Sequence, residues 1–202
     1  MKLVLTGGPS GGKTTLAQAI QKEFASSVVV VPEAASIVFG GGWPRRKSEF
    51  GVQQHQKAIY FLQRELEALM AFENPQKLLI CDRGSLDGMA YWPGPGGPNA
   101  FLTAVATQME HELARYEWVM HLDTAPASYY DESNPLRNEN YSEASALNDL
   151  TKQVWGGHAQ RFIVDNGDGH FIEKMHRALF IVEHIIEGKS YQEILSEMLS
   201  DP

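Results

Sequence analysis

The sequence has little cysteine, little positive charge and no long apolar run. Cys81 is the one cysteine, so an internal disulfide is excluded and a reducing compartment, the cytoplasm, is expected. Seventeen Lys and Arg against 25 Asp and Glu give a formal net charge of −8, which repels a polyanion and argues against a nucleic-acid partner. No stretch approaches the roughly 20 apolar residues of a membrane span, and the opening MKLVLTGG reaches glycine too early for a signal peptide.

The composition is that of a folded globule. Hydrophobic residues make up 43% of the 202 residues and charged residues 21%, which excludes a disordered chain. A chain of this length has room for one full-sized core, so we expect a single domain over residues 1–202, either monomeric or homodimeric.

Short apolar runs alternate with longer segments of helical spacing. The runs, each typical of a strand buried on both faces, are residues 2–5, 28–31, 77–81, 118–122 and 161–164. The predicted helices are residues 14–24, 49–72, 99–115, 144–155, 171–186 and 191–199. This alternation predicts an α/β fold of three layers, α/β/α, around a five-stranded parallel sheet.

Three stretches rich in Gly, Pro, Asn and Ser interrupt the alternation: residues 39–47, 91–98 and 124–141. Loops that leave the carboxyl ends of parallel strands border the ligand crevice, so these stretches are candidates for the walls of a substrate site and for a lid. The alternative is that they are surface connections.

Residues 7–14 read GGPSGGKT, after the apolar KLVLT and before the helical TTLAQAI. This spacing and context are typical of a phosphate-binding loop, in which backbone N–H groups and a helix N-terminus surround the phosphates. Lys13 is expected on the β- and γ-phosphate oxygens and Thr14 on Mg²⁺. The predicted binding residues for ATP, with GTP possible, are Gly7, Gly8, Pro9, Ser10, Gly11, Gly12, Lys13, Thr14 and Thr15.

Acidic residues follow two of the predicted strands. Glu33 lies just beyond VVVV, where it could orient or deprotonate an acceptor hydroxyl; a helix N-cap or a surface position is the alternative. Asp82 ends the apolar LLIC run, the position from which P-loop proteins hold Mg²⁺. Arg83 could stabilise charge on a transferring phosphoryl group, or it could form a simple ion pair with the neighbouring aspartate.

Other polar residues carry weaker hypotheses. Asp87 lies four residues after Arg83 and is followed by Tyr91 and Trp92, a set that suits a sugar and a base or, equally, a capped helix with core aromatics. Leu69, like its apolar neighbours at helical spacing on the segment 49–72, is expected to contact the core.

The segments LTGGPSGGKTTL, VVPEAAS, LLICDRGSLDGMAYW, HLDTAP, NPLRNENYSEA and IVDNGDGHFIEKM together resemble the AAA-type P-loop ATPase/kinase family. That family includes the ribosylnicotinamide kinase domain of the bacterial NAD-biosynthesis regulator and is more distantly similar to deoxynucleoside and nucleoside monophosphate kinases. The resemblance extends from residue 2 to about residue 186 and implies a nucleoside-kinase-like fold. It also implies Glu33 as base, Asp82 and Arg83 as an acidic-Arg pair, Arg137 as a lid residue over the phosphates, and Arg45 and Arg46 on the acceptor side.

These observations predict that the protein is a magnesium-dependent kinase, which transfers the γ-phosphoryl group of ATP to a small hydroxylated, nucleoside-like acceptor. The alternative is a GTP- or ATP-binding switch with slow intrinsic hydrolysis, although a guanine-reading Asn-Lys-x-Asp element is absent from the sequence. A motor-type ATPase needs a catalytic Glu after Asp82, and Arg83 stands there instead.

Overall fold

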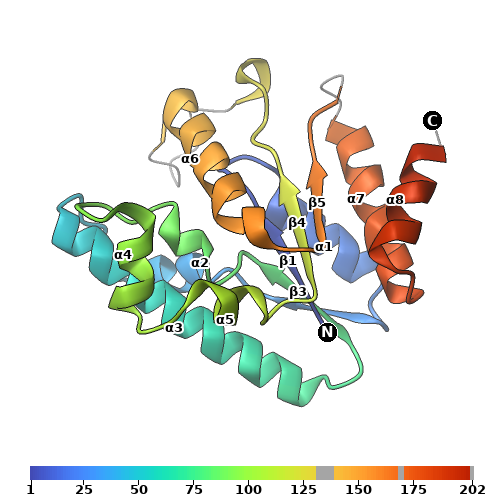
Figure 1. Cartoon of the computed structure of the whole chain (residues 1–202), viewed down its shortest axis with the longest axis horizontal. Helices are drawn as coiled ribbons and strands as arrows, with labels where there is room; N and C mark the ends of the chain where they lie inside the picture. Colours follow the sequence, from blue (N-terminus) through green and yellow to red (C-terminus); the bar gives the residue numbers. More distant parts are fainter. Residues whose placement is uncertain (131–138, 168–170, 201–202) are drawn as a thin grey trace.

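The computed structural model describes residues 1–130, 139–167 and 171–200, and its centre is a five-stranded, wholly parallel sheet (Figure 1). The strands are β1 (Lys2–Thr6), β2 (Val28–Val31), β3 (Leu78–Asp82), β4 (Trp118–Leu122) and β5 (Arg161–Val164). Their order across the sheet is β2-β3-β1-β4-β5. The predicted α/β fold with five parallel strands is therefore confirmed, and each predicted strand is present to within a residue at either end.

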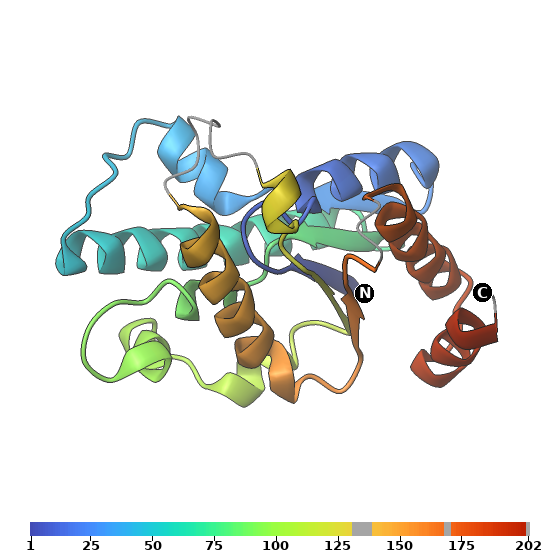
Figure 2. The same ribbon diagram turned by 90° about the horizontal axis from the view of Figure 1, so that it is seen from above.

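Helices cover both faces of the sheet (Figures 1 and 2). They are α1 (Lys13–Glu23), α2 (Ala34–Gly40), α3 (Glu49–Glu73), α4 (Gly97–Ala104), α5 (Met109–Leu113), α6 (Tyr141–Val154), α7 (Phe171–Ile186) and α8 (Tyr191–Ser200). Successive residues of each strand face opposite layers, as in β1, where Leu3 and Leu5 pack in one cluster with α1, α7 and α8. Val4 packs in the other cluster, with residues of α3, α4 and α6.

The helix predicted over residues 99–115 is wrong as a single element, because α4 ends at Ala104 and α5 begins at Met109. Ala106 takes a left-handed backbone conformation with φ of 54°, which no continuous helix allows. The turn brings Glu112 into the interior, where it accepts a hydrogen bond from Thr107 Oγ1 at 2.8 Å.

Helix α2 is an element that the sequence pattern did not predict, and the stretch 39–47 begins inside it. It follows β2 directly, with Glu33 at its N-cap position, and has only seven residues. Seven residues make about two helical turns, and with one buried residue, Ala34, they are too short to show a helical period.

Helix α3 buries polar side chains, namely His55, Tyr60, Gln63 and Glu67. The Glu67 carboxylate accepts hydrogen bonds from Lys2, Arg115 and Tyr116 at 3.0, 2.7 and 2.7 Å, so its burial is compensated by charge and hydrogen bonding. The predicted core contact of Leu69 is wrong: that side chain is 51% exposed. Among the described helices, none is long and apolar enough to cross a membrane.

Candidate functional site

The loop between β1 and α1 wraps tightly against β4. Gly7 has φ of 124°, and a Cβ atom there would lie 2.1 Å from the Leu122 carbonyl oxygen, so only glycine fits. Gly12 is left-handed as well, with φ of 88°, and leads directly into α1. The loop therefore has the strand-turn-helix context that a phosphate-binding loop requires.

Lys13 is folded into this loop. Its Nζ donates hydrogen bonds to the carbonyl oxygens of Gly7 and Gly8 at 3.0 and 2.6 Å, and the residue is buried. Burial, together with the nearby Arg83 guanidinium, lowers the pKa of Lys13 to about 7, even though Asp82 and other carboxylates act in the opposite direction. The protein by itself compensates the positive charge of Lys13 poorly, so a bound polyanion would stabilise the charged form.

Thr14 and Asp82 lie side by side, with Thr14 Oγ1 donating to Asp82 Oδ2 at 2.9 Å. Asp82 reaches this position because β3 is the neighbour of β1, with Asp82 paired to Leu5 at the carboxyl end of both strands. Burial, and then the charge of Glu33, raises the pKa of Asp82. A hydroxyl and a carboxylate at this spacing are oxygen ligands suited to Mg²⁺.

Ser10 stands at the crest of the loop with a left-handed φ of 61°. Its hydroxyl is buried and finds no hydrogen-bond partner within the described residues. A strained residue with an unpaired buried hydroxyl in a loop of this shape fits a site that a phosphate group completes.

Glu33 and Arg83 form the centre of the site. Arg83 Nε donates to Glu33 Oε1 at 2.7 Å, and Ser36 Oγ donates to Glu33 Oε2. Burial raises the pKa of Glu33, but the Arg83 guanidinium and the Ser36 hydroxyl outweigh it, so the pKa of Glu33 is lowered overall. Glu33 occupies the N-cap position of α2 without a side-chain capping bond, so its carboxylate is directed into the site instead.

Asp87 holds Arg83 from the other side. Its Oδ2 accepts from Arg83 Nη1 at 3.2 Å, while its Oδ1 accepts from Thr6 Oγ1 at 2.7 Å and from Trp155 Nε1 at 2.8 Å. These bonds engage both oxygens of a buried side chain, which favours an internal supporting role over direct sugar binding. Arg83 thus forms ion pairs with Glu33 and Asp87. These replace the simple ion pair with Asp82 that the sequence left open as an alternative.

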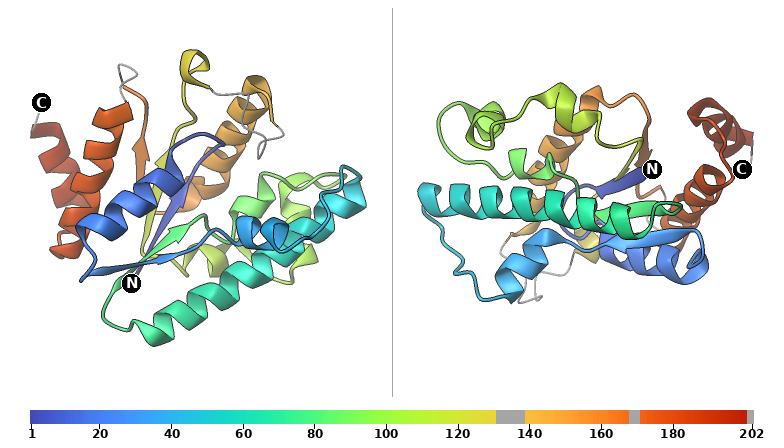
Figure 3. Two further views of the ribbon diagram at one scale, coloured as in Figure 1. Left: turned by 180° about the vertical axis from the view of Figure 1, so that it is seen from behind. Right: turned by 90° about the horizontal axis from the view of Figure 1, so that it is seen from below.

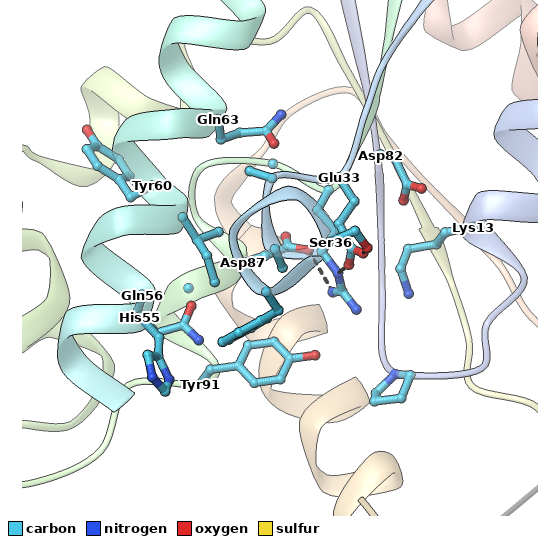
Figure 4. A pocket seen from close by; sticks show the side chains of 18 of the residues that line it. Lys13, Glu33, Ser36, His55, Gln56, Tyr60, Gln63, Asp82, Asp87 and Tyr91 are labelled. Atoms are coloured by element: carbon cyan, nitrogen blue, oxygen red, sulfur yellow. Dashed lines mark hydrogen bonds and ion pairs between the residues drawn. The ribbon is translucent and has the colours of Figure 1, made fainter. Parts of the chain in front are cut away.

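A cavity of about 1040 Å³ joins these groups to the inner face of α3 (Figure 4). Lys13 and Asp82 lie on one side, Gln56 and Tyr60 on α3 lie on the other, and Glu33 stands between them. The phosphate-loop residues that line the cavity are Pro9, Ser10, Gly11, Gly12, Lys13, Thr14 and Thr15. Glu33, Asp82 and Arg83 line the same space, whereas Gly7 and Gly8 do not line it.

The predicted border loops contribute to the same space. Phe39, Arg45 and Arg46 line the cavity from the first stretch, and Tyr91 lines it from the second. Arg137, predicted as a lid residue, lies outside the described residues. Arg45 stacks on the Phe39 ring, with its guanidinium carbon 3.9 Å from the ring centroid.

Asn148 is a supporting residue that the sequence did not reveal. From the middle of α6 its Oδ1 accepts hydrogen bonds from the backbone N–H groups of Gly8 and Thr124 at 3.1 and 3.2 Å, and its Nδ2 donates to Asp123 Oδ1 at 2.9 Å. The residue is buried. An Asn at a helix position 140 residues from the loop that it supports carries no recognisable local signal.

The sequence matches the family described as AAA domain over residues 2–173. The chain belongs to this family. Among curated proteins, no sequence matches the chain. Membership confirms the family expected from the sequence motifs.

Three solved structures, two of them of kinases, are similar in fold to this AAA-domain chain. Deoxyadenosine kinase from M. mycoides with bound dATP is similar at 14% identity and a TM-score of 0.62, with 91% of this chain and 100% of that chain covered. The NadR protein in complex with NAD and AMP-PNP is similar at 15% identity and a TM-score of 0.60; the match covers 94% of this chain and 50% of NadR.

Thymidylate kinase from Candida albicans is similar at 15% identity and a TM-score of 0.58, with 93% and 91% of the two chains covered. At sequence identities of 14–15%, the similarity to these structures establishes the fold alone. The nucleoside-kinase-like P-loop fold is confirmed.

Proposed function

We propose that this protein transfers the γ-phosphoryl group of ATP, with Mg²⁺, to a hydroxyl of a small nucleoside-like acceptor. The observation that carries the proposal is a cavity in which Glu33, paired with Arg83, stands between the phosphate loop and the inner face of α3. A switch or a simple hydrolase needs the phosphate loop but not a second compartment with a carboxylate at its entrance.

The phosphate loop provides the donor half of the site. Backbone N–H groups and the N-terminus of α1 face the phosphates. When the nucleotide binds, Lys13 Nζ gives up its hydrogen bonds to the carbonyl oxygens of Gly7 and Gly8 and donates to phosphate oxygens instead. Thr14 and Asp82 would hold Mg²⁺, which supplies charge neutralisation on the triphosphate when bound. GTP fits the same phosphate contacts, so the preference for ATP rests on the missing guanine-reading element.

The acceptor half depends on Glu33. Its carboxylate carries more lone pairs than Arg83 and Ser36 use, so it can also accept a hydrogen bond from the attacking hydroxyl. Attack on the γ-phosphorus forms the new O–P bond and breaks the bond to ADP, and the hydroxyl proton passes to Glu33. Arg83, held by Glu33 and Asp87, places positive charge where the transferring group passes.

The inner face of α3 fits a flat, polar acceptor. Gln56 and Gln63 bring amide groups, and Tyr91 and Phe101 bring aromatic surface to the same cavity. Such a mixture of a few polar groups and aromatic walls is typical of small-molecule sites.

The test is ADP release with magnesium-ATP across nucleosides, ribosylnicotinamide, nucleoside monophosphates and small sugars, with mass spectrometry of the products. We expect slow hydrolysis alone and fast ADP formation with one acceptor class, which gains one phosphate per ADP. Nucleotide binding without acceptor-dependent turnover anywhere in the panel would contradict the proposal and favour the switch.

A further inference from the structure

The outer face of α3 carries three phenylalanines at positions where solvent should favour polar residues. Three phenylalanines on this 25-residue helix, Phe50, Phe61 and Phe72, are 71%, 53% and 86% exposed. On the opposite side the same helix buries Gln63 and Glu67. Figure 3 (right) shows α3 as the outermost element on this side of the molecule.

The three rings form one row. They follow one another at intervals of eleven residues, which is about three helical turns, so all three point in nearly the same direction over about 33 Å of helix. Each phenylalanine has about 200 Å² of surface, so the exposed fractions amount to on the order of 400 Å² in one protomer. The rings lie about 16 Å apart along the helix, and their summed exposed area is about half of what one partner of a standard interface buries.

The row is self-complementary. Phe50 and Phe72 are equally distant in sequence from Phe61, so an antiparallel copy of α3 related by a two-fold axis at Phe61 places each end ring opposite the other. Two charged residues beside the row follow the same symmetry, because Lys57 lies four residues before Phe61 and Glu65 four residues after it. In such a pair Lys57 of each copy faces Glu65 of the other copy. The two-fold axis therefore produces two equivalent pairs of opposite charge.

We propose that this face is a homodimer interface, in which two copies of α3 pack antiparallel about Phe61. An unrelated partner would require neither the equal spacing of the rings nor the opposite charges at equal distance from the centre. The Phe61 ring at the proposed axis packs edge-on against Tyr60 at a centroid distance of 5.1 Å. Tyr60 lines the cavity, so the dimer would support the helix that forms the acceptor wall of both copies.

The first test is sedimentation equilibrium over a range of protein concentrations. The protein is expected to be a dimer, and Phe61→Asp is expected to be a monomer with unchanged far-UV circular dichroism, because it places two carboxylates at the axis. Leu199→Asp is the matched control, since Leu199 is 88% exposed on α8, and it should remain dimeric. A protein that is monomeric at every concentration, or a dimer that survives Phe61→Asp, overturns the proposal.

A charge exchange tests the antiparallel register. Lys57→Glu and Glu65→Lys should each weaken the dimer by about tenfold or more, because each variant opposes like charges at two places. The double variant should restore the parental dissociation constant. A double variant as weak as the single ones overturns this arrangement.

Cysteine cross-linking locates the axis. Phe61→Cys should form a covalent dimer on mild oxidation, because position 61 meets its own copy and the native Cys81 is buried. Phe50→Cys or Phe72→Cys alone should not, since each is about 33 Å from its own copy. Equal cross-linking through Phe50→Cys would place the axis elsewhere and overturn the proposal; none of these results depends on the kinase activity.

Discussion

At the scale of single residues, both the backbone and the side chain of Arg83 are held in a fixed conformation. Its φ of 76° lies in the left-handed region, where a non-glycine residue is strained by on the order of 1 kcal/mol or more. Backbone bonding to β1 and the two carboxylates Glu33 and Asp87 hold it there. A guanidinium that is oriented before substrate binds loses little conformational entropy when it meets a phosphoryl group.

Glu33→Gln tests the base at this scale. Glutamine keeps the size of the side chain but cannot accept the proton, so acceptor phosphorylation should fall by roughly 10²- to 10⁴-fold while ATP affinity changes little. Steady-state kinetics and equilibrium binding measure the two quantities. Ser36→Ala removes the hydrogen bond to Glu33 Oε2 but keeps the carboxylate, so it is the control and should retain most activity; transfer by Glu33→Gln at the parental rate would refute the assignment.

We expect Lys13 to make nucleotide binding depend on pH. Its pKa is about 7 in the free protein because of burial, and the negative triphosphate raises that pKa in the complex. Between these two pKa values binding takes up a proton, so affinity should decrease as pH rises above 7, by at most about tenfold per pH unit.

Calorimetry of magnesium-ATP binding in two buffers of different ionisation enthalpy measures the proton uptake. The Lys13→Arg variant, whose guanidinium stays charged, should take up no proton through this residue. Binding by the parent protein without proton uptake between pH 7 and 8 would show that Lys13 is charged before the nucleotide arrives.

At the scale of elements, α6 supports the phosphate loop from behind. Asn148 connects α6 to Gly8 and Thr124, and Gly8 lies so close to α6 that a Cβ there would be 2.8 Å from the Asn148 Cβ. The helix begins at Tyr141 with a capping box formed by Asn140 and Glu143. The position of α6 and the shape of the loop are therefore coupled.

Asn148→Ala is expected to lower the free energy of unfolding by about 1–3 kcal/mol, because it leaves buried backbone donors unsatisfied. It should also weaken magnesium-ATP binding, since Gly8 loses its anchor. Urea denaturation and equilibrium titration measure the two effects. Asp149→Ala, at an exposed position of the same helix, is the control; a parental affinity in Asn148→Ala would show that the loop holds its shape without α6.

At the scale of the whole molecule, the strand order explains why one cavity contains all these groups. The chain goes from β1 to β2 on one side of the sheet and reaches β4 and β5 on the other. The crevice at such a reversal lies at the carboxyl ends of the strands. Glu33 after β2, Asp82 at the end of β3 and the loop after β1 all border it.

Nucleotide binding should therefore stabilise the whole fold. Magnesium-ATP at about a hundred times its dissociation constant adds about 2.7 kcal/mol, which corresponds to a rise in melting temperature of roughly 5–10 °C for a chain of this size. Thermal unfolding with and without the ligand measures the shift. Removing Mg²⁺ with a chelator, or substituting Lys13→Ala, should reduce it; an equal shift without Mg²⁺ would contradict the role of Thr14 and Asp82.

Sequence alone determined the strands, the parallel sheet and the glycine-rich loop between β1 and α1, because those features depend on local patterns. A buried parallel strand is a short apolar run, and the phosphate loop is a contiguous set of residues between a strand and a helix. Glu33, Asp82 and Arg83 could be named because strand ends gather at one edge of a parallel sheet.

Only the tertiary structure decided how those residues are paired and supported. The contacts of Arg83 with Glu33 and Asp87, the anchoring of Gly8 by Asn148 and the exposure of Leu69 and Phe72 all depend on which elements pack together. The break between α4 and α5, which brings Glu112 into the interior, is likewise visible only in the folded chain. Contacts between residues far apart in sequence produce no local period or spacing. They arise only when the folded chain brings those residues together, so the sequence pattern does not predict them.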